Sequence, residues 1–475
     1  MHIPGDLLCD IFRLVDGASV DQKFRLSQVC TYWREVALDA PLLWSSLTLA
    51  DSLDANRLPI LLARSRNLPL DIILPQNNSI RFNKPAVDLL TGRVRMRRLH
   101  IHHGTECCFL PRLLEKGFTF PLLEELVIIR TSEVGPQIFL FVSAPQLRRL
   151  HLTYTDCEKW HGLLVPSLEH FTLDYDPADW VPALLPEVFA HCRRLQTLSY
   201  RGATSSMWIG MRGVFPLQAN PGPLVPLTGL QTLRLDMAVS PQFLRAVVGL
   251  RVLDEVEIVT SGSLPDQVTQ ELISEVFRGL DAVVELQFDK IEYRQSFSIR
   301  DRAGRIRRVS AAFGLLDQAW SLPQLWLELV QRLDIITTLQ TLRANIIIWK
   351  DLVDAFAERP PDGELEMHLK LHRGYSPEFS HPYGRRLEAL PVLQLNCPKL
   401  YKVVFHDYDP ERIHWRESGL SRTSVILHLL TSITSTAPRI SVCVSDAGLA
   451  KEAEDVTASA LGAQFPVKYV LCSHC

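Results

Sequence analysis

The sequence contains no long, uninterrupted run of apolar residues. A membrane-spanning helix needs about eighteen or more consecutive, mostly apolar residues, and no segment of the 475-residue chain has such a run. The N-terminus also lacks the apolar core of a secretion signal, because Asp6, Asp10 and Arg13 interrupt it. These absences predict a protein with neither a transmembrane helix nor a secretion signal.

The chain also lacks a dominant charge and a cysteine framework. Its 50 lysines and arginines nearly balance its 53 aspartates and glutamates, which leaves a formal net charge of −3. So small an imbalance does not favour nucleic acid or an anionic membrane as the main partner. The 10 cysteines are scattered without the short spacings of a disulfide-rich domain. We therefore expect a soluble protein of the cytoplasm or the nucleus.

Motifs of common catalytic and cofactor-binding sites are absent too. The chain has no P-loop, no Gly-x-Ser-x-Gly, no His-Glu-x-x-His and no Gly-x-Gly-x-x-Gly. Two clusters contain metal-ligand residue types: His100, His102, His103, Cys107 and Cys108, and the C-terminal Cys472-Ser-His-Cys475. A structural zinc site needs four converging ligands, and neither cluster has a second pair nearby. The sequence predicts no catalytic residue, no cofactor and no metal site.

The N-terminal residues have the spacing of short amphipathic helices. One apolar series recurs at helical intervals: Ile3, Leu7, Leu8, Ile11, Phe12 and Leu14. A second series predicts one or two further helices: Phe24, Leu26, Val29, Trp33, Val36 and Ala37. Helices this short bury little apolar surface by themselves. We expect a partner or a following domain to cover them.

These residues resemble an F-box. The family pattern is Leu-Pro, acidic-Leu-Leu-x-x-Ile-Phe, Leu-x-x-Val-Cys-x-x-Trp and Leu-Trp. Its counterparts here are Ile3-Pro4, Asp6–Phe12, Leu26–Trp33 and Leu43-Trp44. Ile3 replaces the usual Leu, which conserves volume. The segment Leu43–Leu49 is most similar to the expanded F-box families of mushroom-forming fungi. The alternative is an ordinary amphipathic helical cap on a solenoid.

The resemblance implies a partner and an interface. An F-box binds a Skp-family adaptor, and through it a cullin, by packing large apolar side chains against the helices of that adaptor. The residues implied for this interface are Pro4, Leu7, Leu8, Ile11, Val29 and Trp33. Trp44 is expected to join the F-box to the following domain. Phe12 and Leu26 are the best candidates for the small core of the helices.

A repeated pattern follows, in which apolar residues occupy the first, fourth and sixth positions. Copies begin at Met96, Leu123, Leu147, Leu168, Leu195 and Leu230, and weaker ones at Leu253, Val283, Leu339 and Leu400. Most intervals are roughly 20 to 35 residues, which straddles the period of a leucine-rich repeat. The pattern resembles irregular leucine-rich repeats and predicts an α/β solenoid, or horseshoe. The alternative is a non-repetitive α/β fold.

We predict three regions along the chain. They are an F-box-like helical domain at 1–46, a leucine-rich-repeat-like solenoid at 47–445 and a C-terminal cap at 446–475. A Gly- and Pro-rich loop at 203–226 and a β-hairpin insertion at 297–313 interrupt the solenoid. The hairpin contains Arg300, Arg302, Arg305, Arg307 and Arg308. These arginines indicate either a solvated hairpin or a site for an acidic or phosphorylated partner.

Strand geometry predicts which side chains a target would contact. Side chains alternate between the two faces of a strand, so residues beside the paired apolar positions point to the concave face of a horseshoe. The candidates are His100, His102, Ile129, His151, Asp174, Arg201, Arg234, Asp236, Glu257, Asp289 and Arg343. The early strands present histidine and apolar side chains, and the later strands present mixed charge.

The expected function is the substrate-recognition adaptor of a Skp–cullin–F-box ubiquitin ligase, a non-catalytic subunit. Such a subunit holds a target protein close to the transfer chemistry that other subunits perform. The alternative is a leucine-rich-repeat scaffold for protein interactions whose F-box-like end no longer binds the ligase. A third possibility is a hydrolase or metal enzyme whose site carries no recognised motif.

Overall fold

The computed structural model contains two compact units. Unit 1 comprises Met1–Thr204, Ala219–Leu235 and Ala246–Gly249, and unit 2 comprises Ser205–Gln218, Asp236–Arg245 and Leu250–Cys475. The described residues are 3–14, 19–49, 52–75, 95–103, 117–130, 140, 142–153, 160–175, 181–202, 227–236, 244–245, 253–260, 271, 274–291, 294–312, 329–331, 333, 335–345, 349–371, 394–407, 426, 429–430, 433–435, 440–444 and 468–471.

Unit 1 begins with short helices. They are α1 (Gly5–Arg13), α2 (Val20–Leu26), α3 (Thr31–Asp39) and the 3-10 turn η1 (Pro41–Trp44). A capping box between Ser19 and Gln22 starts α2, and the Sγ of Cys30 accepts the backbone N–H of Trp33 at the start of α3. These helices confirm the helical N-terminal region that the apolar spacing predicts.

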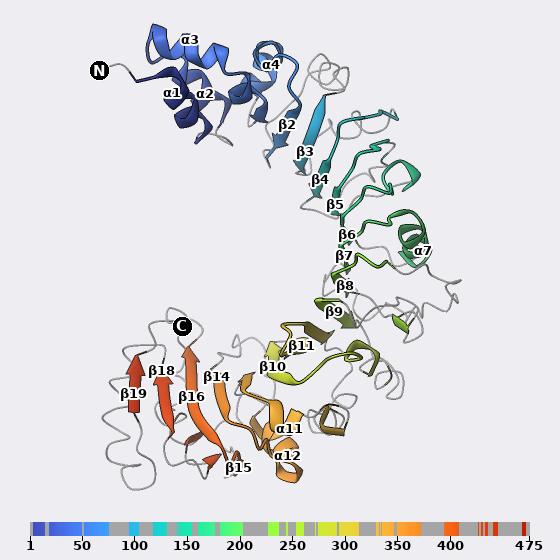
Figure 1. Cartoon of the computed structure of the whole chain (residues 1–475), viewed down its shortest axis with the longest axis vertical. Helices are drawn as coiled ribbons and strands as arrows, with labels where there is room; N and C mark the ends of the chain where they lie inside the picture. The colour runs from blue at the N-terminus through green and yellow to red at the C-terminus, as the bar shows by residue number, and fades with distance from the viewer. Residues whose placement is uncertain are drawn as a thin grey trace, which may run out of the picture. The chain divides into compact units, whose positions relative to one another are not determined.

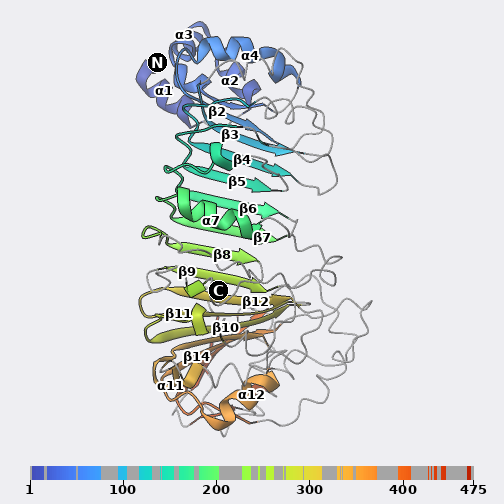
Figure 2. The ribbon, with the colours of Figure 1, turned by 90° about the vertical axis from the view of Figure 1, so that its right-hand side faces the viewer.

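A parallel sheet completes unit 1. Its elements are β1 (Ser46–Thr48), α4 (Ser52–Arg64), β2 (Leu70–Leu74), β3 (Met96–His103), β4 (Glu125–Arg130), β5 (Arg149–Thr153), η2 (Trp160–Gly162), β6 (His170–Tyr175), α7 (Val181–His191), β7 (Thr197–Gly202) and β8 (Thr232–Asp236). Each strand from β1 to β8 pairs in parallel with the next one in the chain. Figure 2 shows these strands as a ladder that begins at the helices.

Buried apolar side chains alternate with more exposed side chains along the strands, so the two faces of this sheet differ in character. The buried pairs on β3 to β8 are Leu99 and Ile101, Leu126 and Ile128, Leu150 and Leu152, Phe171 and Leu173, Leu198 and Tyr200, and Leu233 and Leu235. The register places the members of neighbouring pairs opposite one another. Helix α7, whose Leu185, Val188 and Phe189 are buried, lies beside this face (Figure 1). The apolar pairs and α7 together form the core of this part of unit 1.

Unit 2 contains a run of paired strands with a different order. Its strands are β9 (Glu255–Thr260), β10 (Val283–Ile291), β11 (Arg294–Asp301), β12 (Ile306–Ala312), β13 (Thr341–Asn345), β14 (Leu365–Leu371), β16 (Leu400–Asp407), β18 (Ser441–Val444) and β19 (Lys468–Leu471). The paired order is β9-β12-β11-β10-β13-β14-β16-β18-β19. The described part of this unit also has α11 (Ile335–Thr338), α12 (Trp349–Glu358) and the short pair β15 (Leu395–Asn396) and β17 (Ile433–Thr434).

The hairpin expected at 297–313 is part of the unit 2 sheet. Strand β11 is antiparallel to both β10 and β12, and β12 pairs in parallel with β9. Phe297, Ile299 and Val309 are at most 3% exposed, so the hairpin contributes to the core. In its described part, the long interval between the repeat copies at Val283 and Leu339 therefore contains a hairpin.

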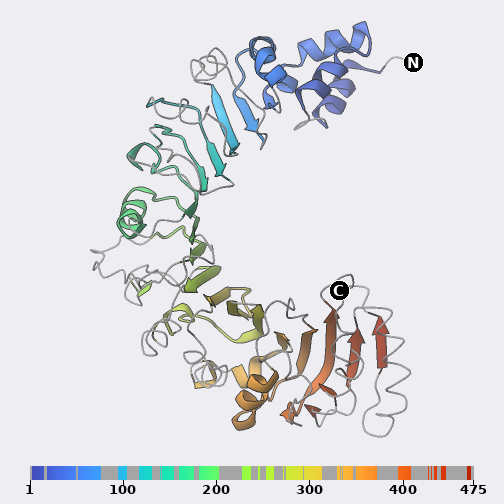
Figure 3. The ribbon, with the colours of Figure 1, turned by 180° about the vertical axis from the view of Figure 1, so that it is seen from behind.

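The structure confirms a mixed α/β fold with N-terminal helices and a large open sheet. The predicted loop at 203–226 lies outside the described residues, as does the predicted cap at 446–475 apart from β19. The predicted domain boundaries stay a prediction. Within the described ranges, no helix combines the length and apolar character needed to cross a membrane. Figure 3 shows the same elements from behind.

A close backbone contact in unit 1 gives a first testable prediction. A Cβ at Gly162 would overlap the carbonyl oxygen of Val142 and lie 3.2 Å from the Cα of Ser143. Gly162→Ala should therefore lower the free energy of unfolding by about 2 kcal/mol, because backbone cannot move aside as a side-chain tip can. Chemical denaturation of the full chain measures the change.

Gly229→Ala is the matched control, because a Cβ there meets only the carbonyl oxygen of Leu195 at 3.7 Å. We expect a change within about 0.5 kcal/mol for this variant. Equal effects of the two substitutions would show that the contact at Gly162 is not tight.

Candidate protein-interaction surfaces

Helix α1 has apolar side chains on two adjacent sides. Leu8 and Phe12, one turn apart, are 0% and 1% exposed and point into the helical core. Successive residues turn by about 100° around a helix, so Leu7, Ile11 and Leu14 form a separate strip beside that pair. Leu7 is 53% exposed and Leu14 is 85% exposed. The helix therefore leaves Leu7 and Leu14 uncovered by its own chain.

Exposed large apolar side chains are concentrated in this helical region. Nine are found among the described residues, and six of them make up what we call the N-terminal apolar surface: Ile3, Leu7, Leu14, Val29, Leu38 and Leu42. Single exposed apolar residues are normal, whereas a concentration of them marks an interaction site. The N-terminal apolar surface is therefore a candidate binding surface.

The structure divides the six residues implied for the Skp-adaptor interface. Pro4, Leu7 and Val29 are exposed, and Ile11 and Trp33 are half-buried. Leu8 belongs to the interior and cannot contact a partner while the helices stay folded, so we remove it from the proposed surface. Leu14 is not among the six residues implied by the F-box resemblance. It follows Leu7 by seven residues, so helical spacing places Leu7 and Leu14 on the same face.

Trp44 connects the helices to the sheet of unit 1. Its side chain is fully buried, and its indole N–H donates to the carbonyl oxygen of Ala37 at 2.7 Å. Its ring packs edge-on against Phe24 with the centroids 5.6 Å apart. The guanidinium of Arg64, from α4, lies 4.4 Å from the centroid of Trp44 and 4.7 Å from that of Phe24. This packing agrees with the role expected of Trp44.

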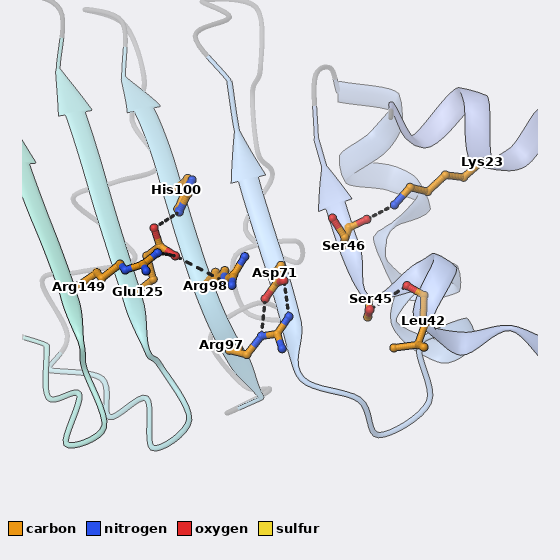
Figure 4. Close-up of polar contacts among 10 residues, drawn as sticks. All are labelled: Lys23, Leu42, Ser45, Ser46, Asp71, Arg97, Arg98, His100, Glu125 and Arg149. Carbon is orange, nitrogen blue, oxygen red and sulfur yellow. Dashed lines mark hydrogen bonds and ion pairs between the residues drawn. The ribbon is translucent and has the colours of Figure 1, made fainter. Parts of the chain in front are cut away.

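Polar contacts fix the same junction. The ammonium of Lys23, a fully buried residue, donates to the backbone oxygen of Ser46 at the start of β1 (Figure 4). The backbone N–H of Asp71 in β2 donates to the oxygen of Ser45 at 2.9 Å. A hydrogen bond from Arg57 to Asp21 joins α4 to α2 and lowers the pKa of the Asp21 carboxyl. The helical region and the sheet are therefore packed as one body.

Loss of the Trp44 side chain should destabilise unit 1. Trp44→Ala removes a large buried ring and should lower the free energy of unfolding by about 3–5 kcal/mol. Trp44→Phe keeps most of the ring and loses one hydrogen-bond donor, which should cost about 1–2 kcal/mol. Chemical denaturation followed by circular dichroism measures both, and a loss below about 1 kcal/mol for Trp44→Ala would contradict this role for the indole.

The face of β3–β8 opposite the buried pairs carries mainly polar side chains, and we call it the open face of unit 1. Its residues are, strand by strand, Arg98, His100 and His102; Glu125, Val127 and Ile129; Arg149, His151 and Thr153; His170, Thr172 and Asp174; Thr197, Ser199 and Arg201; and Thr232 and Arg234. The register aligns His100, Val127, His151, Thr172, Ser199 and Arg234 in one row across the strands.

Carboxylates on the open face of unit 1 are shared among several cations. Glu125 lies 3.4 Å from Arg98, 3.2 Å from His100 and 3.9 Å from Arg149 (Figure 4). Asp174 lies 3.1 Å from His151 and 4.0 Å from Arg201. Glu125 and Asp174 thus each contact more than one cation across neighbouring strands.

Two histidines on this face have depressed pKa values. Burial, followed by the charges of His100 and His151, lowers the pKa of His102. Burial, followed by the charge of Arg149, lowers the pKa of His170. Both imidazoles are therefore neutral at pH 7.

Charged side chains on one face of the unit 2 sheet form ion pairs. Its ion pairs are Arg308 with Glu257 at 3.5 Å, Arg300 and Arg343 with Glu285 at 3.3 and 2.6 Å, Lys370 with Asp289 at 2.9 Å, and Lys402 with Glu366 at 2.7 Å. The predicted contact residues Glu257, Asp289 and Arg343 thus lie in internal ion pairs. The side chain of Asp236, another candidate, lies outside the described residues.

Two further hairpin arginines, Arg305 and Arg307, have internal partners as well. Arg307 is fully buried, and its guanidinium donates to the backbone oxygens of Leu253 at 2.9 Å and Ile306 at 3.0 Å. Burial lowers the pKa of Arg307 to about 10. Arg305 pairs with the buried Asp301 at 2.7 Å. These two arginines stabilise the hairpin and the sheet instead of facing a partner.

A histidine pair lies on the unit 2 face. The rings of His368 and His406 are stacked with their centroids 5.1 Å apart, and His368 Nδ1 and His406 Nε2 are 2.8 Å apart. The other ring nitrogen of His368 contacts Glu366 at 3.0 Å. Burial, followed by the charges of His368, Arg343 and Lys370, lowers the pKa of His406 to about 4. The pair is therefore neutral at pH 7.

The depressed pKa of His406 predicts acid sensitivity. The unfolded chain binds a proton at its ordinary pKa of 6.5, whereas the folded chain does so at about 4. The contribution of this group to the free energy of unfolding is therefore lost as the pH falls from about 6.5 to about 4. In His406→Gln, the free energy of unfolding should fall less across this pH window than in the wild type. Urea denaturation at several pH values measures the difference.

His191→Gln is the control for that measurement, because His191 is an exposed residue of α7 in unit 1. We expect this variant to keep the acid sensitivity of the wild type. An unchanged profile in His406→Gln would mean that other groups account for the acid sensitivity.

The two clusters of metal-ligand residue types found in the sequence do not form a metal site within the described residues. No group of three or more His, Cys, Asp or Glu side chains converges there in a way that could hold a metal ion. The side chain of His103, together with Cys107, Cys108 and residues 472–475, lies outside what the structure describes.

Comparison with known proteins identifies the helical region. Residues 1–50 match the F-box-like family, and no curated protein matches the chain. The match covers α1 to β1 and therefore the whole N-terminal apolar surface. The chain thus has an F-box-like domain at its N-terminus, a class of domain that in general binds the Skp1 adaptor.

Proposed function

We propose that this protein is a substrate-recognition adaptor of a Skp–cullin–F-box ubiquitin ligase. The observation that carries the proposal is the N-terminal apolar surface, which the F-box-like domain leaves exposed while Leu8, Phe12 and Trp44 fill its interior. Large apolar side chains that enter pockets of a partner dominate the energy of such interfaces. Leu7, Leu14 and Val29 are the exposed anchors that we assign to the Skp-family adaptor.

The sheets would hold the target protein in this arrangement. The F-box-like domain connects the chain to the adaptor and the cullin, and transfer of ubiquitin to the bound target occurs on other subunits. We assign the strands the role of an irregular leucine-rich-repeat array, supported by the recurring apolar pairs and by parallel register. A ligase adaptor of this kind acts in the cytoplasm or the nucleus.

Co-purification with a Skp-family adaptor tests the proposal. The full chain should form a stoichiometric complex with the adaptor of its host. The double variant Leu7→Asp and Val29→Asp places two charges on exposed positions and should lose the complex, because each buried unpaired charge costs several kcal/mol. Size-exclusion chromatography of the co-expressed proteins measures the complex.

Leu122→Asp is the matched control, because Leu122 is also exposed, at 39%, but lies outside the helical region. It should keep the complex, and all variants should retain the circular dichroism spectrum of the wild type. A folded wild-type chain that forms no complex would contradict the proposal and favour a scaffold whose helices only cap the sheet.

A further inference from the structure

Part of the N-terminal apolar surface lies on chain segments outside the helices. Ile3 and Pro4 precede α1, and Val29 lies in the connection between α2 and α3. A helix fixes its residues through its own backbone hydrogen bonds, whereas the backbone groups of a connecting segment need partners from elsewhere. The positions of Ile3, Pro4 and Val29 therefore depend on contacts with other parts of the chain.

Tyr32 of α3 holds the segment that precedes α1. Its phenolic hydroxyl donates to the backbone oxygen of Ile3 at 3.0 Å. The hydroxyl lies over the start of α1, since a Cβ at Gly5 would be 3.4 Å from its oxygen. The next backbone oxygen, that of Pro4, accepts the N–H of Leu8 at 3.1 Å. Tyr32 thus joins the segment that carries Ile3 and Pro4 to α3.

Arg34, two residues further along α3, holds the connection that carries Val29. Its Nε donates to the backbone oxygen of Ser27 at 3.1 Å. The hydroxyl of Ser27 in turn donates to the backbone oxygen of Phe24 at 2.7 Å. Side chains two residues apart on a helix diverge by about 200° around its axis. Tyr32 and Arg34 therefore leave α3 on opposite sides, and one helix holds both segments.

We infer that Tyr32 and Arg34 are positioning residues of the surface that binds the Skp-family adaptor. Their donors hold the backbone of two segments whose apolar side chains face the partner. A segment that is already ordered before binding loses less conformational freedom in the complex, so the affinity is higher. That the partner is this adaptor rests on the proposed function, whereas the order that the two hydrogen bonds give the free chain does not.

Tyr32→Phe keeps the aromatic ring and removes the donor. The affinity of the full chain for the adaptor of its host, measured by isothermal titration calorimetry, should fall about fivefold, as expected for one lost hydrogen bond. In the free chain, amide hydrogen exchange of residues 3–8 should become faster. Tyr401→Phe is the matched control, because the exposed Tyr401 donates to Glu366 at 3.4 Å in unit 2. It should leave both measurements unchanged.

Two neutral substitutions separate the hydrogen bond of Arg34 from its charge. Glutamine has an N–H donor as many bonds from the backbone as the Nε of arginine, whereas methionine has a methyl group there. Arg34→Met should therefore weaken adaptor binding about fivefold and speed the exchange of residues 27–30, while Arg34→Gln should keep most of the affinity. The losses of Tyr32→Phe and Arg34→Met should multiply in the double variant, because the two bonds share no partner.

Three results would each overturn the inference. The first is an unchanged affinity in Tyr32→Phe and Arg34→Met. The second is an equal loss in Arg34→Met and Arg34→Gln, which would assign the effect of Arg34 to its charge. The third is weaker binding without faster exchange in the free chain, because the two side chains would then act on the adaptor directly.

The same measurements separate this inference from the proposed function. A folded wild-type chain that binds no adaptor would remove the ligase role, and exchange in the free chain would then decide whether Tyr32 and Arg34 order the apolar surface. A wild-type chain that binds the adaptor, with Tyr32→Phe and Arg34→Met binding equally well, would remove the inference alone.

Discussion

In-register pairing of parallel strands is the constraint on which the sheet of unit 1 depends. Side chains alternate along each strand, so a slip by one residue would exchange the covered face and the open face. The pairings of Leu126 with Leu150 and of Val127 with His151 show how one register serves both faces. It aligns the leucines into a continuous core and aligns the polar residues into rows. The core and the candidate target surface are therefore consequences of the same pairing.

The helical region depends on that sheet for its own stability. Strand β1 follows the helices directly and pairs with β2, and Lys23 and Trp44 fasten the helices to this edge. The interior of the helical region is thus filled from within the chain. The apolar strip on α1 stays exposed although the helices around it are well packed. This property distinguishes a binding surface from helices that are exposed because they are poorly packed.

Local patterns in the sequence were enough to predict the helices and strands. They were not enough to predict the partners of charged side chains. Helical spacing and the first-fourth-sixth apolar pattern predicted α1 to α3 and the strands from β3 to β10. Leu7 and Leu8 are adjacent and equally apolar, so only the folded structure shows that Leu8 is buried and Leu7 is exposed. The burial of Arg307 and the pairing of Arg343 with Glu285 arise between distant segments, which no local pattern contains.

Hydrogen–deuterium exchange of the full chain with and without a Skp-family adaptor tests the central claim most directly. The account predicts slower exchange for residues 3–14 and 28–39 when the adaptor is present, with unchanged exchange for β3 to β8. Protection of the sheet instead of α1 and α3, or no protection of a folded chain at saturating adaptor, would contradict the claim that the N-terminal apolar surface is the adaptor-binding site.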